Sequence, residues 1–323
     1  MAKILGIGNS LVDMLCVLDS DNILSEAGLP KGSMQLIDKD TQSKLLKLIE
    51  GKKIERARGG SVPNTISGIQ KLGMQTVFTG KIGTDKTGDF FESDLKSMGV
   101  DTRLVHVSDL PSGSCLSLIS PDGERTMATC LGATGTFCAD EITADLFEGV
   151  DICHIDGYLL QNYELVLKAM DLAVKAGVKI SIDLGSYNVV ADNLQFLQEV
   201  IPQYVSIVFA NEEESKAYSN MEPEEALDLL ASQVDYAVVK VGAKGSFIKH
   251  GSEKVFVEPL KGVNCIDTTG AGDLYASGFL YGLASGKSIA ECGRIGALVS
   301  GNVVEIVGTS MDETRWNTIR ANC

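Results

Sequence analysis

The sequence is poor in histidine and has no paired cysteines. It contains three histidines and eight cysteines; the cysteines form no C-x-x-C pair, and of the eight only Cys153 has a histidine, His154, next to it. Zinc sites depend on such pairs, so this spacing argues against a bound zinc ion. Scattered cysteines of this kind are typical of free core thiols in a reducing compartment, and we therefore expect a cytoplasmic protein.

Long apolar runs are also missing. No stretch approaches the roughly 18 consecutive apolar residues that a membrane span needs. The apolar N-terminal segment is interrupted by Gly6, Gly8, Asn9 and Asp13, which break up the core that a signal peptide requires. We therefore expect neither export nor a membrane partner, and interpret the opening segment as a strand.

Positive charge is scarce. The chain has 28 Lys and Arg against 43 Asp and Glu, which gives a formal net charge of −15. Because nucleic acids are bound mainly through clusters of Lys and Arg, we expect no nucleic-acid partner. An acidic protein can still bind a nucleotide, but it must use backbone dipoles, a few well-placed cations and a divalent metal.

Short apolar runs alternate along the chain with helix-length amphipathic stretches, a pattern typical of α/β proteins. Buried strands are predicted at 4–8, 77–80, 152–155, 180–183, 207–210 and 237–241, and helices at 63–72, 86–98, 163–176 and 223–230. We therefore expect a doubly wound, mostly parallel sheet flanked by helices.

Two stretches, 11–37 and 103–129, interrupt this alternation. In the second, short antiparallel strands are predicted at 103–107, 114–119 and 124–129, with a turn at Pro121-Asp122-Gly123. Together these strands predict one small β-sheet. Because no linker or internal repeat separates the parts, we expect residues 1–323 to fold as a single domain.

The segment DTTGAGD at 267–273 indicates the most specific chemistry. Its glycines and alanine, just ahead of an apolar run, predict a backbone turn that opens into a helix, where free N–H groups and the helix dipole stabilise a phosphate. Asp273 would repel a bound phosphate but can take a proton from a hydroxyl nucleophile. The segment therefore predicts phosphoryl transfer to an alcohol; the alternative is a glycine-capped loop whose aspartate begins a helix.

Four motifs occur in an order that resembles the ribokinase family, also called the PfkB family, over nearly the whole chain. They are Gly59-Gly60 with Asn64, GKIGTDKTG at 80–88, Asn211 with Glu214, and DTTGAGD at 267–273. The resemblance implies a ribokinase-like fold and ATP-dependent phosphorylation of a hydroxymethyl group on a sugar or nucleoside. It also implies that the insertions form a lid over the substrate; the alternative is a decorative β-meander on the edge of the main sheet.

The resemblance implies that Asp273 is the catalytic base and that the backbone of Gly270, Ala271 and Gly272 stabilises the transferring phosphate. Arg125 is the only arginine in the predicted lid turn near the site. We expect it to neutralise charge on that phosphate. An exposed salt bridge of the lid is the alternative.

The acceptor is expected near the end of the first strand, where open α/β sheets place their ligands. The residues assigned to it are Asn9, Asp13, Gly59, Gly60, Asn64 and Tyr158. Asp13 can accept hydrogen bonds from two adjacent hydroxyls, and the two glycines let a sugar approach the backbone closely. Caps or turns are the alternative roles for Asn9 and Gly60.

On the nucleotide side, the family's N-x2-E signature implies that Asn211 and Glu214 organise Mg²⁺, with Glu214 bound to it through water. An N-cap asparagine on an acidic helix start is the alternative. The residues expected to bind ATP are Asn211, Lys240, Gly242, Gly245, Thr268 and Asn302. Asn302 lies in a late helix and is expected to border the adenine pocket.

Three segments resemble adenosine-kinase-like members more than ribokinase itself: GIGNSLVDML at 6–15, GERTMATCLGA at 123–133 and IDGYLL at 155–160. Thr269 departs from that pattern, since many adenosine kinases have asparagine there. On the strength of the three segments, and despite Thr269, we favour an adenosine-like nucleoside over a sugar such as ribose, fructose or 2-keto-3-deoxygluconate.

A non-catalytic nucleotide or sugar sensor is the alternative from another class, and the presence of Asp273 disfavours it because a sensor needs no base. Activation by a monovalent cation such as K⁺ and a homodimer through the lid are both left open.

Overall fold

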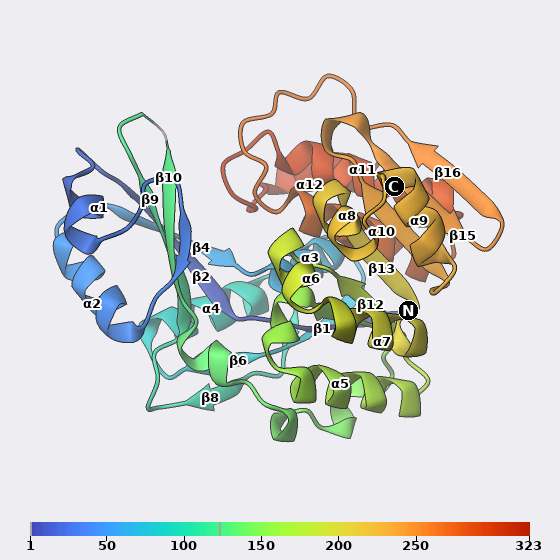
Figure 1. Cartoon of the computed structure of the whole chain (residues 1–323), viewed down its shortest axis with the longest axis horizontal. Helices are drawn as coiled ribbons and strands as arrows, with labels where there is room; N and C mark the ends of the chain where they lie inside the picture. The colour runs from blue at the N-terminus through green and yellow to red at the C-terminus, as the bar shows by residue number, and fades with distance from the viewer. Residues whose placement is uncertain (1, 123) are drawn as a thin grey trace.

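A nine-stranded sheet lies at the centre of the computed structural model, which describes residues 2–122 and 124–323 (Figure 1). The strand order is β16-β15-β14-β13-β12-β11-β1-β5-β7. The strands are β1 (Lys3–Ile7), β5 (Gln75–Thr79), β7 (Asp101–Thr102), β11 (Ile152–Asp156), β12 (Lys179–Asp183), β13 (Ile207–Asn211), β14 (Tyr236–Lys240), β15 (Ser246–His250) and β16 (Glu253–Val257). Neighbours from β14 to β7 are parallel, whereas β15 and β16 pair antiparallel. The predicted mostly parallel sheet is confirmed.

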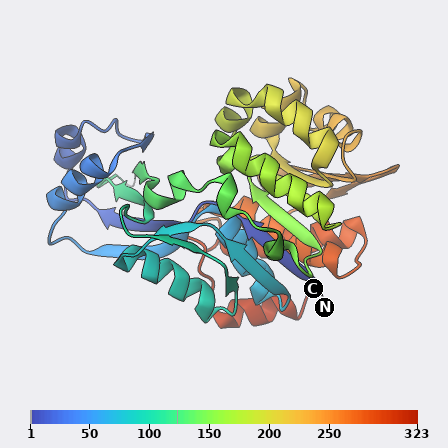
Figure 2. The ribbon, with the colours of Figure 1, turned by 90° about the horizontal axis from the view of Figure 1, so that it is seen from below.

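Helices cover both faces of this sheet, as Figure 2 shows. One face packs against α5 (Tyr163–Lys175), α7 (Leu194–Tyr204) and α9 (Pro223–Ala231), and the other against α3 (Ser61–Lys71), α4 (Lys86–Ser97), α10 (Ala271–Ala284) and α11 (Ile289–Val303). Alternate strand residues serve the two sides: Val208 packs in the first layer and Phe209 in the second. This burial on both faces explains why the strands are continuous apolar runs.

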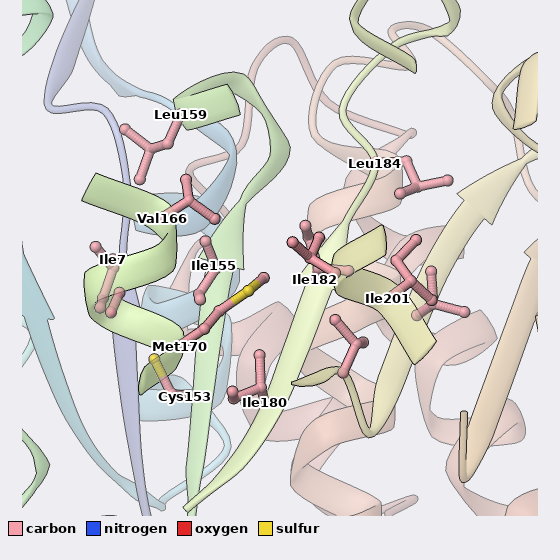
Figure 3. Packing of buried hydrophobic residues seen from close by; sticks show 14 of the residues in the cluster. Ile7, Cys153, Ile155, Leu159, Val166, Met170, Ile180, Ile182, Leu184 and Ile201 are labelled. Atoms are coloured by element: carbon pink, nitrogen blue, oxygen red, sulfur yellow. The ribbon is translucent and has the colours of Figure 1, made fainter. Parts of the chain in front are cut away.

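The layer around α5 is built mostly from branched aliphatic side chains (Figure 3). Ile155 from β11 and Ile182 from β12 point from the sheet toward helix residues such as Met170, and all three are fully buried. Among the described residues, no helix is long and apolar enough to cross a membrane.

A separate five-stranded sheet projects from this body, at the left of Figure 1, with the strand order β3-β10-β9-β2-β4. Its strands are β2 (Leu11–Val17), β3 (Met34–Leu36), β4 (Ile54–Gly59), β9 (Gly113–Ile119) and β10 (Arg125–Cys130). One side packs against α1 (Asn22–Ala27), α2 (Lys39–Leu48) and α4. The predicted strands at 114–119 and 124–129 are present and antiparallel; Gly123 of the predicted turn lies outside the described residues.

The strand predicted at 103–107 does not join this small sheet. β8 (Val105–Val107) instead pairs in parallel with β6 (Lys81–Gly83), as a two-stranded extension beside the main sheet. Backbone N–H groups of Arg103 and Val105 donate to carbonyls of Phe78 and Gly80, which holds the segment at the edge of β5. The position next to β9 is taken by β2, which pairs with it in parallel.

Two valines of α5 offer a matched test of the core. Val166 is 1% exposed and Val174 is 53% exposed. Replacement by alanine changes helix propensity equally at both positions, but only at Val166 does it remove buried contacts. Val166→Ala should lower the free energy of unfolding by about 2 kcal/mol more than Val174→Ala, measured by urea denaturation. Equal effects of the two substitutions would contradict this packing.

Candidate active site

A cavity of about 800 Å³ opens at the carboxyl ends of the central parallel strands. Asp183 ends β12, Asn211 ends β13 and Lys240 ends β14, and all three line it. Asp13 reaches the same cavity from the small sheet. The cavity therefore lies between the two sheets, and its size is in the range of small-molecule sites.

The predicted turn before α10 is present. Gly270 is the N-cap residue with φ +71°, and a Cβ atom there would stand 2.2 Å from Thr309 Cγ2. Asp267 holds the turn: one carboxylate oxygen accepts the N–H of Thr269 (3.0 Å) and the other accepts the N–H of Gly308 (2.9 Å). Within the described chain, the N–H groups of Gly272 and Asp273 donate to no other residue, so they are available to an anion.

The carboxylate of Asp273 is oriented by α3. Ser61 Oγ donates to its Oδ1 at 2.7 Å and Asn64 Nδ2 donates to its Oδ2 at 3.0 Å. Asn64 is itself fixed, because its Oδ1 accepts from Thr309 Oγ1 at 3.1 Å. Burial raises the pKa of Asp273 to about 6, although these two donors oppose the rise. The group is therefore ionised at neutral pH but basic enough to accept a proton.

Lys240 brings a positive charge to the turn. A Cβ atom on Gly272 would lie 3.0 Å from Lys240 Nζ, and Nζ lies 2.9 Å from Asp183 Oδ2. Burial alone would raise the pKa of Asp183, but the Lys240 ammonium outweighs it and the pKa of Asp183 is lowered. Burial would lower the pKa of Lys240, but the surrounding carboxylates outweigh it and raise the lysine's pKa. Both groups stay charged beside the N–H groups of the turn.

Asn211 and Glu214 form a reciprocal cap at the start of α8 (Glu212–Ser219). Asn211 Oδ1 accepts the Glu214 N–H at 2.8 Å, and Glu214 Oε2 accepts the Asn211 N–H at 2.8 Å. Burial and the charge of Asp183 raise the pKa of Glu214 to about 7. Among the described residues, no group of three or more His, Cys, Asp or Glu converges to hold a metal ion. Mg²⁺ usually keeps several waters when bound, so Asn211 and Glu214 fit an ion held through water, without an all-protein cage.

Asp13 and Tyr158 also lie in the cavity wall. Burial raises the pKa of Asp13 to about 6, opposed by the positive charge of Arg58. A Cβ atom on Gly59 would stand 2.5 Å from Asp13 Oδ1, so a side chain at position 59 would displace this carboxylate. Tyr158 donates its hydroxyl to the carbonyl of Gly185 at 3.0 Å.

Most residues predicted from sequence for the site do line the cavity. They are Asp13, Gly60, Asn64, Tyr158, Asn211, Glu214, Lys240, Gly242, Gly245, Thr268, Gly270, Ala271, Gly272 and Asp273. Arg125 begins β10, but its side chain lies outside the described part of the structure. Gly59 lies behind Asp13 rather than in the wall.

Two predicted residues are placed elsewhere. Asn9 is buried, and its side chain accepts a hydrogen bond from Thr134 Oγ1 at 3.3 Å. Its N–H donates to Asp156 Oδ2 at 3.3 Å, so Asn9 ties the segment after β1 to β11. Asn302 lines a separate small cavity with Arg315 and donates to the carbonyl of Leu298 at 2.9 Å.

Sequence reasoning missed several wall residues. Ser61 and Asp183 supply polar groups, and an apolar patch beyond the turn is formed by Pro259, Leu260, Val263, Ala297 and Val304. Asp183 could have been found, because it ends a predicted strand at the same sheet edge as Asn211 and Lys240. The apolar patch comes partly from a loop that carries no motif.

Comparison with known proteins places the chain among kinases. The pfkB family carbohydrate kinase model matches residues 32–315. The crystal structure of adenosine kinase from Sinorhizobium meliloti has a TM-score of 0.88 and 31% identity, covering 100% of this chain and 99% of that one. The structure of a probable sugar kinase from Rhizobium etli has a TM-score of 0.88 and 30% identity, and the match covers 99% of this chain and 98% of that one. An uncharacterized sugar kinase from Archaeoglobus fulgidus is 30% identical over 242 residues, which cover 75% of this chain and 96% of that protein.

Gly270 and Gly286 provide a test of the turn. Both have positive φ, +71° and +72°, but a Cβ atom at Gly286 would meet nothing within 4 Å. Alanine at either position incurs the left-handed backbone cost of about 1–2 kcal/mol. Gly270→Ala should lower the free energy of unfolding further than Gly286→Ala, because only its Cβ collides with Thr309. Urea denaturation measures the difference, and equal losses would contradict the described turn.

Proposed function

The chain belongs to the pfkB family of carbohydrate kinases, and we propose that its acceptor is adenosine or a closely related nucleoside. As a member of this family it is a phosphotransferase that phosphorylates a hydroxyl group of a nucleoside or sugar with ATP. The observation that carries the catalytic part of the proposal is the Asp273 carboxylate, oriented by Ser61 and Asn64 beside unpaired N–H groups at the start of α10.

In the proposed reaction, Asp273 accepts the proton of the attacking acceptor hydroxyl. The N–H groups of Gly272 and Asp273 and the ammonium of Lys240 stabilise the negative charge on the transferring phosphoryl group. The cavity wall supports this, because Asp13, Tyr158, the turn and the apolar patch all line the same cavity.

The nucleotide extends from the turn toward the apolar patch. Gly242, Gly245 and Thr268 border the phosphates, and Leu260 and Val263 contact the adenine. Members of this family use ATP with Mg²⁺, which supplies charge neutralisation on the phosphates when bound. Asn211 and Glu214, which line the same cavity, would hold the ion through water.

An adenosine-like acceptor is supported by similarity along the whole chain to an adenosine kinase. Tyr158 also supports it, because this 39%-exposed aromatic ring in the cavity wall offers a stacking surface for a base. A sugar acceptor is the second candidate. It is favoured by the equally close match to a probable sugar kinase and by threonine at position 269.

The proposal includes three further features. The insertions at about 11–37 and 103–129, apart from β8, contribute a lid that carries Asp13 over the acceptor. The open face of the small sheet, where Val17 is 66% exposed and Leu36 is 65% exposed, supports a homodimer through this lid. A monovalent cation such as K⁺ activates the turn that Asp267 stabilises. A cytoplasmic location is supported by the eight free cysteines.

Asp273→Asn tests the base directly. It should lower kcat by about 10²- to 10⁴-fold while ATP affinity is retained, because the proton acceptor is lost without a change in shape. In the wild-type enzyme, kcat should fall as the pH drops through about 6, since the pKa of Asp273 is raised to about 6 and only its ionised form is a base. Near-normal kcat in the variant would remove Asp273 from the mechanism.

The acceptor is tested by comparing kcat/KM for adenosine, 2′-deoxyadenosine and fructose. If Asp13 binds the ribose hydroxyls, loss of one hydroxyl leaves a buried acceptor unpaired, and 2′-deoxyadenosine should be disfavoured by about 1–3 kcal/mol. Asp13→Ala should weaken acceptor binding and leave ATP affinity unchanged. Equal use of both nucleosides would exclude Asp13 as the ribose anchor, and activity on fructose alone would favour the sugar kinase.

A further inference from the structure

Asp183 contacts both Lys240 and the backbone of Gly185 in the cavity wall, although no sequence motif marks it. Its side chain is 8% exposed at the end of β12. One carboxylate oxygen, Oδ2, lies 2.9 Å from Lys240 Nζ, and the other, Oδ1, accepts the N–H of Gly185 at 3.0 Å. Both oxygens are therefore engaged, each by a different partner.

The first of these contacts fixes a flexible cation. A lysine ammonium sits on a four-carbon chain and adopts many positions unless a partner holds it. Asp183 is the carboxylate that Lys240 pairs with in the structure, and the ammonium so held lies against Gly272 of the turn. Loss of the negative charge at position 183 would leave Lys240 without this partner, beside the remaining carboxylates Glu214 and Asp273.

The second contact reaches the aromatic ring at the acceptor end. The carbonyl of Gly185 accepts the Tyr158 hydroxyl at 3.0 Å. A Cβ atom on Gly185 would stand 3.2 Å from Tyr158 Cε2, so the ring packs directly on this glycine, whose φ is +81°. The backbone of Tyr158 is held independently, because its N–H donates to Asp156 Oδ1 at 3.1 Å. Asp183 therefore contacts the segment that holds the ring at Gly185.

We propose that Asp183 is a positioning residue that sets Lys240 at the phosphate-binding turn and, through Gly185, sets Tyr158 at the acceptor end. It thereby couples the two halves of the cavity. The inference rests on the proposed kinase function and assigns Asp183 no contact with substrate. Its two carboxylate oxygens act separately, which makes the two effects experimentally separable.

Asp183→Asn tests the lysine contact. The amide oxygen can still accept the Gly185 N–H, but the charge that holds Lys240 is gone. We expect kcat to fall about 10- to 100-fold, as for a misplaced catalytic group, while KM for the acceptor changes much less. The effect of Lys240→Met on kcat should then shrink strongly in the Asp183→Asn background. Additive effects of the two substitutions, or a kcat within about twofold of wild type for Asp183→Asn, would overturn the proposal.

Tyr158→Phe tests the second contact, because it keeps the ring and removes the hydroxyl. It should raise the acceptor KM by about 2- to 10-fold in the wild type and in Asp183→Asn, where the Gly185 contact persists. In Asp183→Ala, residue 183 no longer accepts the Gly185 N–H, and Tyr158→Phe should then have no further effect on the acceptor KM. The same rise in KM in all three backgrounds would overturn this part of the proposal.

Two controls separate a misfolded variant, and a failure of the proposed function, from a failure of the Asp183 proposal. If Asp183→Ala loses its folded circular dichroism spectrum, Asp183→Val takes its place, since valine has no side-chain oxygen to accept the Gly185 N–H. A wild-type enzyme that phosphorylates none of the tested acceptors refutes the proposed function itself. An active wild type with additive variant effects refutes only the role of Asp183.

Discussion

The close approach of α3 and α10 is the contact on which the site depends. A Cβ atom on Gly68 would lie 2.5 Å from Ser277 Oγ, so only glycine lets the two helices pack this tightly. The same approach brings Ser61 and Asn64 within hydrogen-bonding distance of the Asp273 carboxylate. Two motifs separated by about two hundred residues thus become one unit, in which one helix supplies the carboxylate and the other sets its direction.

Charge in the cavity is arranged so that one cation serves several carboxylates. Asp183, Glu214 and Asp273 face a space in which Lys240 is the buried cation that they share. Pairing with Lys240 lowers the pKa of Asp183, whereas burial leaves Glu214 and Asp273 with raised pKa values of about 7 and about 6. An excess of carboxylate of this kind suits an anionic nucleotide only when a divalent metal and the backbone N–H groups of the turn offset it.

The sequence predicted the main sheet well because its strands are buried on both faces and read as continuous apolar runs. It did not predict β4, whose sequence IERARG is charged and whose early residues are exposed. Asn302 was misplaced for a reason of helix geometry: Ala297, Ser300, Gly301 and Val304 share one face of α11, and Asn302 points about 100° away from Gly301. Motifs fix which segment meets the ligand, but the phase of a helix decides which side chain does.

The central claim is that the turn before α10 binds the transferring phosphate beside an oriented base. A crystal structure with a non-hydrolysable ATP analogue and adenosine tests it most directly. We predict that the terminal phosphate accepts hydrogen bonds from the N–H groups of Gly272 and Asp273, and that the acceptor's primary hydroxyl lies within hydrogen-bonding distance of the Asp273 carboxylate. A terminal phosphate bound away from this turn, or an acceptor hydroxyl out of reach of Asp273, would contradict the account.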